Sequence, residues 1–343
     1  MAKKKLQCAI IGGGAIAQAC HAPGYLNNKY ADLVAFCDPS LERHDEMKEI
    51  HPNIRGYLSA KDMFAVEDLD AVSVCSPNKF HAAHTVAALK AGCHVLCEKP
   101  MALTLREADR MNAAAKAARK KLMIAFSNRL IKGPMRCKEL IKQKAIGKPF
   151  MIRVRFAHGG PYPGWAKSDW FYQPTIAAGG AMFDMGIHAI DLSLWLLGPA
   201  KTVMAKADTL VKKIPVDDNA VILMELGDRA MGYIEVGWSS KPGFTGLEIY
   251  GTEGSLICDY NRGLQLCRGR ASAGKDSEIK WEMIEPKAGE GGWVDEIDHW
   301  IDVVRGKKKL EMDGAAGRAA LEVALAAYKS SDTGRRINVG KRK

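Results

Sequence analysis

The 343-residue sequence lacks the features that mark several large classes of protein. No apolar run is long enough to span a bilayer, which argues against a membrane-spanning protein. There is no basic stripe interleaved with aromatic residues and no helix-turn-helix or zinc-finger spacing, although the formal net charge is +11 at pH 7. Part of the basic excess lies in the terminal segments 3–5 and 341–343, and the rest is scattered. We therefore expect no nucleic-acid partner and no membrane partner.

A disulfide framework is missing as well. The nine cysteines are an odd number, and most of them lie within apolar runs. This pattern favours small buried side chains in a reducing cytoplasm over the crosslinks of a secreted protein. Cys93, His94 and Cys97 are close in sequence, but the alternation of a strand points His94 away from both thiols. No second ligand pair follows at zinc spacing, so we predict a cytoplasmic protein without a metal site.

The N-terminal segment has the pattern of a dinucleotide-binding turn. An apolar strand at 6–11 leads into Gly12, Gly14 and Ala17, which fit the pattern G-x-G-x-x-G/A. Gly12 permits the tight turn, and Gly14 lets the backbone approach a pyrophosphate. The helix that follows, to about residue 28, would face the phosphates with the free N–H groups of its first turn. The cofactor candidates in this turn are Gly12, Gly14, Ala15 and Ile16.

A carboxylate follows at the position that binds the adenosine ribose. The segment 32–38 is a second strand, and Asp38 ends it at the spacing expected for that carboxylate. A carboxylate there repels a ribose phosphate, so NAD is favoured over NADP. Arg43 is near in sequence and tempers this preference.

Strands and helices go on alternating as far as residue 126, which predicts a doubly wound parallel sheet. We expect strands at 71–75, 93–97 and 122–126, with helices at 79–91 and 104–119, the second capped by Thr104. Segments just past the carboxyl ends of such strands line the ligand crevice. Further cofactor candidates at these positions are Ser76, Asn78, His81, Glu98 and Lys99.

Past residue 126 the pattern changes to that of a largely antiparallel sheet. A helix at 133–144 is followed by strand-like segments at 150–156, 220–226, 230–238, 244–250 and 254–259. Helices are expected at 293–304 and 314–329. The predicted fold class is therefore α/β, with a Rossmann domain at 1–126 and a second α/β domain with an open sheet at 127–343. We expect helix 314–329 to dock back on one of the domains, with the Rossmann domain as the candidate.

The segment from Gly179 to Gly198 predicts an amphipathic helix that carries two ionisable residues in an apolar run. Asp184 and His188 are four residues apart and so share one face, with Asp191 a further turn along. Such a pair is often only a surface ion pair. Here the apolar surroundings and the carboxylate pull the imidazole pKa in opposite directions, which predicts a group near neutrality, suited to general acid or base chemistry.

An aromatic-rich loop at 162–172 precedes this helix. Aromatic loops with glycine and proline often serve as packing plugs, and they also stack on the apolar faces of sugars. Both readings stay open. Tyr162 and Trp165 are the candidate substrate contacts.

Three motifs occur in one order along the chain, namely the glycine turn with Asp38, the segment Glu98-Lys99-Pro100, and Gly179-Gly180 followed by Asp184 and His188. This order resembles the glucose-fructose oxidoreductase, inositol dehydrogenase and rhizopine catabolism family (Gfo/Idh/MocA) over nearly the whole chain. The resemblance implies a Rossmann domain and a second domain whose open sheet forms a homodimer or homotetramer interface. It implies that Lys99, Asp184 and His188 are catalytic and that Arg129 lies near the substrate.

We therefore predict hydride transfer between a secondary hydroxyl carbon of a sugar, sugar derivative or cyclitol and NAD, with NADP a less favoured cofactor. His188 would take the hydroxyl proton, Asp184 would orient the imidazole, and Lys99 would hold the oxygen. Two alternatives stay open. One is an NAD-dependent glycosidase that uses transient oxidation and elimination, and the other is a non-catalytic regulator that senses NAD or a sugar.

Overall fold

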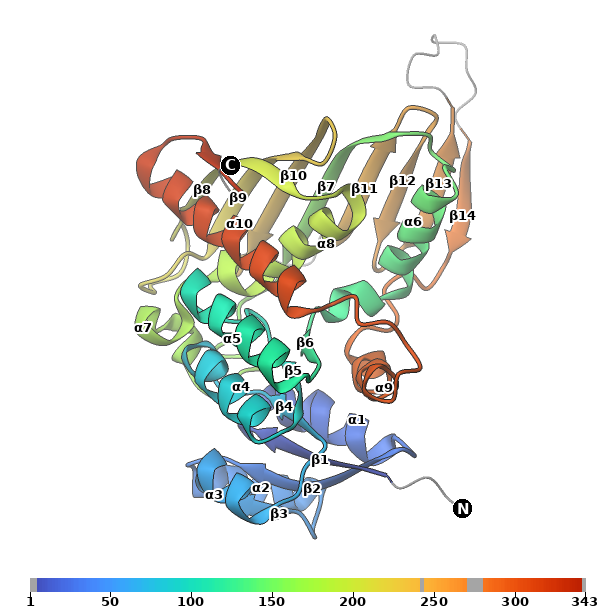
Figure 1. Ribbon diagram of the computed structural model, residues 1–343. Coiled ribbons are helices and arrows are strands. Elements are labelled where there is room, and N and C mark those ends of the chain that lie inside the picture. The colour runs from blue at the N-terminus through green and yellow to red at the C-terminus, as the bar shows by residue number, and fades with distance from the viewer. Residues whose placement is uncertain (1–4, 241–243, 270–279, 341–343) are drawn as a thin grey trace.

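The computed structural model describes residues 5–240, 244–269 and 280–340, and shows two sheets joined by helices (Figure 1). The basic terminal segments named above lie outside this range except for Lys5. The first sheet has six strands in the order β3-β2-β1-β4-β5-β6. All of its neighbouring pairs are parallel. This is the doubly wound order that the sequence predicts, with the reversal of strand order between β1 and β4.

The predicted elements of the first domain are present, whereas the strand Arg55–Tyr57 and the helices Leu41–Ile50 and Ala60–Val66 were not predicted. Its strands are β1 (Leu6–Ile11), β2 (Ala31–Cys37), β3 (Arg55–Tyr57), β4 (Ala71–Val74), β5 (His94–Cys97) and β6 (Leu122–Ile124). Its helical segments are η1 (Ala17–His21), α1 (Ala22–Asn27), α2 (Leu41–Ile50), α3 (Ala60–Val66), η2 (Asn78–Phe80), α4 (His81–Lys90) and α5 (Leu105–Ala118). The predicted cap of α5 is present, because Thr104 Oγ1 accepts the Glu107 N–H and Glu107 accepts the Thr104 N–H.

The second sheet has nine strands in the order β14-β13-β12-β11-β7-β10-β9-β8-β15. Only the central pair of β7 and β10 is parallel among its described strand pairs. The strands are β7 (Pro149–Ala157), β8 (Ala200–Asp208), β9 (Asn219–Leu226), β10 (Ala230–Gly237), β11 (Gly246–Gly251), β12 (Gly254–Asp259), β13 (Gly263–Arg268), β14 (Trp281–Glu285) and β15 (Ile337–Asn338). The sequence reading missed β8, β13, β14 and β15, which lie at or next to the sheet edges. Few side chains of β8, β14 and β15 are buried, whereas β13 was missed although Leu264 and Leu266 are buried.

Helices cover one face of this second sheet (Figure 1). The helical segments are η3 (Ser127–Leu130), α6 (Lys132–Lys142), η4 (Trp170–Tyr172), α7 (Pro174–Ala177), η5 (Met182–Gly186), α8 (Ile187–Leu197), α9 (Trp293–Val304) and α10 (Gly314–Thr333). Along β7, Ile152, Val154 and Phe156 are buried beneath these helices, whereas Arg153 and Arg155 between them are only partly buried. The alternation leaves the other face of the sheet open.

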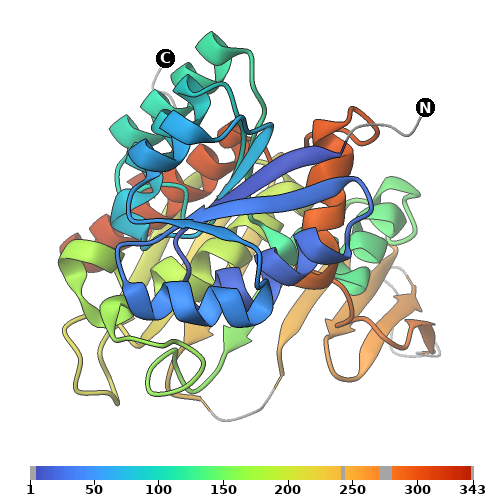
Figure 2. The same ribbon diagram turned by 90° about the horizontal axis from the view of Figure 1, so that it is seen from below.

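The two last long helices return to the first sheet (Figure 2). Helix α10 packs on β8 and also on α5, where Asn112 Nδ2 donates to the Gly314 carbonyl at 3.0 Å. Helix α9 packs on α1, and Asn28 Nδ2 donates to Asp298 Oδ1 at 2.6 Å. Residues from the end of the chain therefore pack against helices of the N-terminal domain.

One stretch, Pro174–Leu197, is long and apolar enough to cross a membrane, which the sequence reading did not find. It includes the site helix α8. Within the structure, 78% of its most apolar window is buried. A helix buried to this extent is typical of a protein core.

Candidate active site

The helix that carries Asp184 and His188 begins with the π turn η5 and continues as α8. Its start is held by a carboxylate from the loop before β9, because Asp217 accepts the Gly180 and Met182 N–H groups, both at 2.8 Å. Tyr328 of α10 donates its hydroxyl to the same carboxylate at 2.6 Å. A Cβ on Gly180 would lie 1.8 Å from the Asp217 carbonyl oxygen. The glycine pair is therefore required for this close approach.

Lys99, just past β5, meets Asp184 across the gap between the two sheets. Its Nζ lies 2.6 Å from Asp184 Oδ1, and the indole N–H of Trp238 donates to Asp184 Oδ2 at 3.2 Å. Burial raises the pKa of the Asp184 carboxyl, but the charge and hydrogen bond of Lys99 outweigh it, so this pKa lies below its usual value. The structure thus places an ion pair at the carboxyl end of the parallel sheet.

His188 lies one turn further along the same helix and is 5% exposed. Its ring packs edge-on against Phe126, with the centroids 6.4 Å apart. Burial, aided by the Lys99 charge, lowers the His188 pKa to about 3, and the Asp184 charge does not compensate. The expectation of a pKa near neutrality was therefore wrong for the chain without ligands. The imidazole is neutral at pH 7 and so can accept a proton, although a pKa this low makes it a weak base in the chain without ligands.

The expected contact between Asp184 and His188 is absent from the hydrogen bonds of the described residues. Both oxygens of Asp184 are engaged by Lys99 and Trp238, and Nδ1 of His188 is buried without a partner within the described ranges. The carboxylate therefore orients Lys99 directly. It acts on His188 only through its charge.

His158 was missed by the sequence reading, as was Trp238. His158 follows β7 and accepts the Gly160 N–H on Nδ1 at 2.8 Å. Its Nε2 lies 3.2 Å from Met185 Sδ. Burial lowers the His158 pKa, and the Asp184 charge opposes the shift. A polar residue at the end of a predicted strand was the available signal, but sequence alone did not show that β7 ends at the site.

The glycine turn has the shape that a dinucleotide requires. Gly12 adopts φ +95°, and a Cβ there would lie 2.6 Å from the Ser76 backbone nitrogen. Nothing lies within 4 Å of a Cβ built on Gly14, so the backbone is open to a ligand there. The helix starts at Ala15 and Ile16, whose turn leaves N–H groups free, as in every helix. These residues fit the pyrophosphate of NAD.

Asp38 is beside this turn, as expected. Its carboxylate accepts the Gly13 N–H at 2.8 Å and the Ser40 N–H at 2.9 Å, which holds it at the end of β2. Arg43 is engaged by Glu46 at 2.5 Å, so its charge is neutralised within the protein. This arrangement fits a ribose with free hydroxyls better than one with a phosphate.

Two other cofactor candidates, His81 and Asn78, form hydrogen bonds to backbone carbonyls of neighbouring segments. His81 places its ring nitrogens 2.6 Å from the Ser76 carbonyl and 2.7 Å from the Pro100 carbonyl, which ties two crevice segments together. Asn78 donates to the Ala177 carbonyl at 3.0 Å and links the sheet to α7. Both side chains are buried. Direct cofactor contacts by these residues stay predictions.

The three substrate candidates differ in how far the structure exposes them. Arg129 is buried and gives Nε and Nη2 to Asp191 at 2.7 and 2.6 Å, so its guanidinium is used to hold α8. Tyr162 and Trp165 are 40% and 51% exposed. Their loop reaches the site through Tyr172, whose ring packs against Trp238.

The same aromatic loop is tied to the first sheet. Lys167 Nζ lies 2.7 Å from Glu46 Oε1 and 2.8 Å from Gln18 Oε1. Gln18 in turn donates to the Gly13 carbonyl at 2.7 Å. The loop therefore spans from the second sheet to the glycine turn.

Known proteins share this organisation. Residues 6–126 match the oxidoreductase family with an NAD-binding Rossmann fold, and residues 135–257 match the GFO/IDH/MocA C-terminal domain. The D-glucoside 3-dehydrogenase of Escherichia coli K12 is 28% identical, with 99% of each chain covered. The myo-inositol 2-dehydrogenase of Thermotoga maritima is 27% identical, with 97% of this chain and 98% of the relative covered.

One solved structure has the same fold as this chain over its whole length. The WlbA dehydrogenase from Bordetella pertussis, in complex with NADH and UDP-GlcNAcA, has a TM-score of 0.83 and 26% identity, with 100% of both chains covered. The matched domains, the glycine turn with Asp38 and the paired Lys99 and Asp184 lead to one conclusion. The chain belongs to the GFO/IDH/MocA family of NAD-binding oxidoreductases.

Proposed function

We propose that this protein transfers a hydride between a secondary hydroxyl carbon of a sugar, sugar derivative or cyclitol and NAD. The observation that carries this proposal is the buried neutral His188 beside the ion pair of Lys99 and Asp184, at the carboxyl end of a dinucleotide-binding sheet. Residues 1–126 would bind NAD and residues 127–343 the substrate. Relatives that act on a D-glucoside and on myo-inositol support a polyol ring as substrate.

Each site residue has a separate task in the oxidation. NAD, when bound, supplies the acceptor for the hydride. His188 takes the hydroxyl proton as the C–H bond breaks, so that the alcohol becomes a carbonyl. Lys99, held by Asp184, donates a hydrogen bond to the oxygen and stabilises its developing negative charge. The reverse reaction uses the same groups in the opposite order.

The exposed aromatic rings of the loop support the proposed substrate class. Tyr162 and Trp165 offer apolar faces near the crevice, and such faces stack on sugar rings. The neutralised Arg43 and the held Asp38 support NAD over NADP. The described cysteines are all free, which supports a cytoplasmic location.

The test is to mix the purified protein and NAD with a panel of sugars, cyclitols and aryl glycosides. NADH absorbance and aglycone release are followed in parallel. We expect NADH to accumulate with one ring stereochemistry. Aglycone release without net NADH would assign the protein to the redox-assisted glycosidases. Binding of NAD and sugar without any turnover would indicate a sensor.

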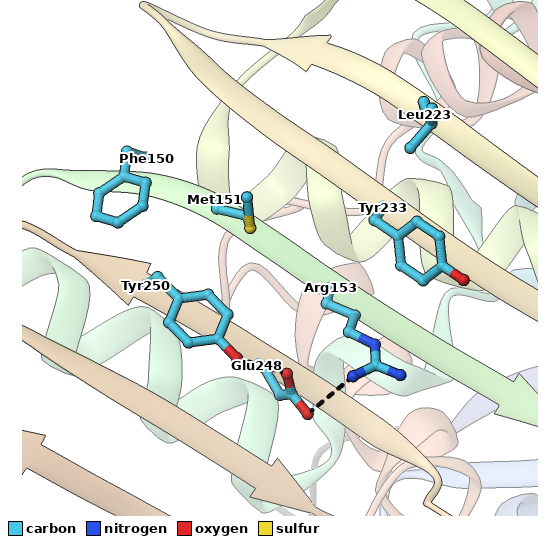
Figure 3. A pocket seen from close by; sticks show the side chains of 7 residues that line it. All are labelled: Phe150, Met151, Arg153, Leu223, Tyr233, Glu248 and Tyr250. Atoms are coloured by element: carbon cyan, nitrogen blue, oxygen red, sulfur yellow. Dashed lines mark hydrogen bonds and ion pairs between the residues drawn. The ribbon is translucent and has the colours of Figure 1, made fainter.

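We also propose that the open face of the second sheet pairs with a second copy of this chain. Exposed apolar side chains on this face are Met204 (49%), Val221 (40%), Leu223 (50%) and Met231 (55%). A shallow pocket among them is lined by Phe150, Met151, Arg153, Leu223, Tyr233, Glu248 and Tyr250 (Figure 3). The pocket lies on the side of the sheet away from α8, so it is separate from the catalytic residues.

The size of this face suits a stable dimer. Nine strands give a face of roughly 40 Å by 25 Å at ordinary strand spacing and rise. Stable interfaces bury about 800 Å² per partner. The open face therefore exceeds the area that a stable dimer requires.

Sedimentation velocity tests the interface. The wild-type protein should be a dimer or larger. Leu223→Glu with Met231→Glu should produce a folded monomer, because each change buries a charge in an apolar contact. Leu210→Glu is the matched control, since Leu210 is 69% exposed but lies outside the strands. A monomeric wild-type protein would contradict the proposal.

A further inference from the structure

Three ionisable residues form a buried cluster next to Lys99. His21 comes from η1, Glu98 from the end of β5 and Glu296 from α9. They are 0%, 7% and 1% exposed, and one nitrogen or oxygen atom from each lies within 4.8 Å of the others. None of the three is required by the hydride-transfer scheme above. Burying ionisable groups costs free energy unless they are hydrogen-bonded, paired or neutral, so the cluster must contain such a compensation.

A chain of hydrogen bonds links the cluster to the backbone of Lys99. Tyr25 OH lies 2.8 Å from Ser73 Oγ, which lies 3.0 Å from His21 Nδ1. His21 Nε2 lies 3.0 Å from Glu98 Oε1, and Glu98 Oε2 accepts the Lys99 N–H at 3.1 Å. One arrangement of protons satisfies every link, with Tyr25 donating to Ser73, Ser73 to Nδ1, and the Nε2–H to Glu98. The chain therefore ends on a carboxylate anion beside Lys99.

Glu296 differs from the other two members of the cluster. Its Oε1 is buried and has no partner among the described residues. Burial raises its pKa well above the usual value, and the nearby Glu98 charge adds to the shift. For Glu98, burial is outweighed by the hydrogen bond from His21, and its pKa is lowered. An unpaired buried anion beside a second carboxylate is costly, so the geometry places the proton on Glu296 and the negative charge on Glu98, which His21 and the Lys99 N–H stabilise.

We propose that His21 is a positioning residue for Lys99 that acts on it through Glu98, and that the neighbouring Glu296 is held as a neutral acid. His21 fixes the orientation of the Glu98 carboxylate, which holds the Lys99 backbone on one side while Asp184 holds the ammonium group on the other. Because Glu296 carries no charge, Glu98 holds the negative charge of this cluster. The proposal rests on the proposed role of Lys99 in hydride transfer.

A bound divalent cation is the competing account of a histidine and two carboxylates. The contact of 3.0 Å between His21 and Glu98 already satisfies both groups without an ion. A proton on Glu296 removes the remaining excess charge. We therefore favour the proton, and the experiment below separates the two accounts.

Infrared spectroscopy of the full chain tests Glu296 and needs no substrate. The wild-type protein should show the carbonyl stretch of a protonated carboxyl at pH 7, and Glu296→Gln should remove it. Metal analysis of the wild-type protein should find no stoichiometric ion. A missing carboxyl band, or one bound divalent ion per chain that Glu296→Gln releases, would overturn the proposal.

Steady-state kinetics on the substrate found above tests the action on Lys99. His21→Phe and Glu98→Gln should each lower kcat by about ten- to a hundredfold, the range for a small displacement of a catalytic group, with kcat falling more than KM. Glu296→Gln, which mimics the neutral acid, should keep kcat within about twofold. His21→Gln, which restores an N–H donor, should recover part of the loss.

His94→Gln is the matched control, because His94 lies at the opposite end of β5 and accepts the Lys121 N–H. Equal kcat values for His21→Phe and this control would refute the positioning role. So would a loss in Glu296→Gln as large as that in Glu98→Gln. If the wild-type protein oxidises no substrate, the proposed function fails while the infrared result still decides the state of Glu296.

Discussion

At His188, the cost of burying a charge exceeds the benefit of a nearby carboxylate. The side chain is 5% exposed, and both oxygens of Asp184 are occupied by Lys99 and Trp238. Only the charge of Asp184 reaches the imidazole, and the charge of Lys99 opposes it. The ring is therefore neutral over the whole physiological pH range.

The first prediction concerns this residue. His188→Ala should lower turnover at least about a hundredfold, the usual contribution of a general base, while NAD affinity is kept. Steady-state kinetics and NAD titration by fluorescence measure the two quantities. Turnover near the wild-type value would remove His188 from the catalytic role.

Among the elements, the start of the site helix depends on two glycines that a Cβ cannot replace. A Cβ on Gly180 would meet the Asp217 carbonyl oxygen at 1.8 Å, and one on Gly179 would meet the Tyr328 hydroxyl at 2.1 Å. The Asp217 contact is to backbone, which cannot move aside without displacing β9. The glycine pair therefore fixes the position of the helix that carries the acid and the base.

The second prediction follows from this contact. Gly180→Ala should lower the free energy of unfolding by about 1–3 kcal/mol, the usual cost of overpacking, and should reduce kcat through displacement of the helix. Urea unfolding and kinetics measure both effects. Gly186→Ala is the control, because the nearest contact of its Cβ would be the flexible Met182 side chain at 3.3 Å, with Val236 at an ordinary 3.6 Å. Equal stability of the two variants would contradict the argument.

The third prediction concerns the loop that Lys167 ties to the first sheet. The Lys167 side chain is 39% exposed, and exposed ion pairs contribute at most about 1 kcal/mol. Lys167→Met should therefore speed the release of NAD by up to about fivefold, measured by stopped-flow fluorescence. Lys148→Met, which removes a pair with Asp228 on a distant turn, should leave the rate unchanged. An unchanged rate in both variants would show that the loop does not retain NAD.

For the whole molecule, buried histidines make stability depend on pH. Burial lowers the pKa of His94 to about 4 and that of His188 to about 3, from 6.5 in the unfolded chain. The unfolded state therefore binds more protons between these values, and stability rises with pH in this range. The stabilisation is complete above pH 6.5 and is lost as the pH falls toward 4 and then 3.

The fourth prediction is that the free energy of unfolding decreases steadily as the pH is lowered from about 6.5 to about 4. Urea unfolding at a series of pH values measures it. In the His94→Gln variant the free energy of unfolding should depend less steeply on pH, since the side chain at position 94 no longer takes up a proton on unfolding. A slope that is unchanged in this variant, with the wild-type slope present, would assign the effect to other groups.

Much of this protein was determined by the sequence itself. The alternation of apolar strands and helices predicted the parallel sheet, because each strand is buried on both faces and reads as an apolar run. The glycine turn and Asp38 were readable because a phosphate needs a backbone without side chains. Lys99, Asp184 and His188 were identified by their place in three ordered motifs, and the structure brings them to the same end of the sheet.

Tertiary structure alone decided how these groups are partnered. Asp184 could be paired with His188 from helical spacing, but Lys99 and Trp238, distant in sequence, take both of its oxygens. Glu296 joins Glu98 only because α9 returns to the first sheet. Contacts of this kind depend on how helices and strands pack, and local periodicity carries no information about that packing. The pKa values follow from the same packing, because burial and opposing charges set them together.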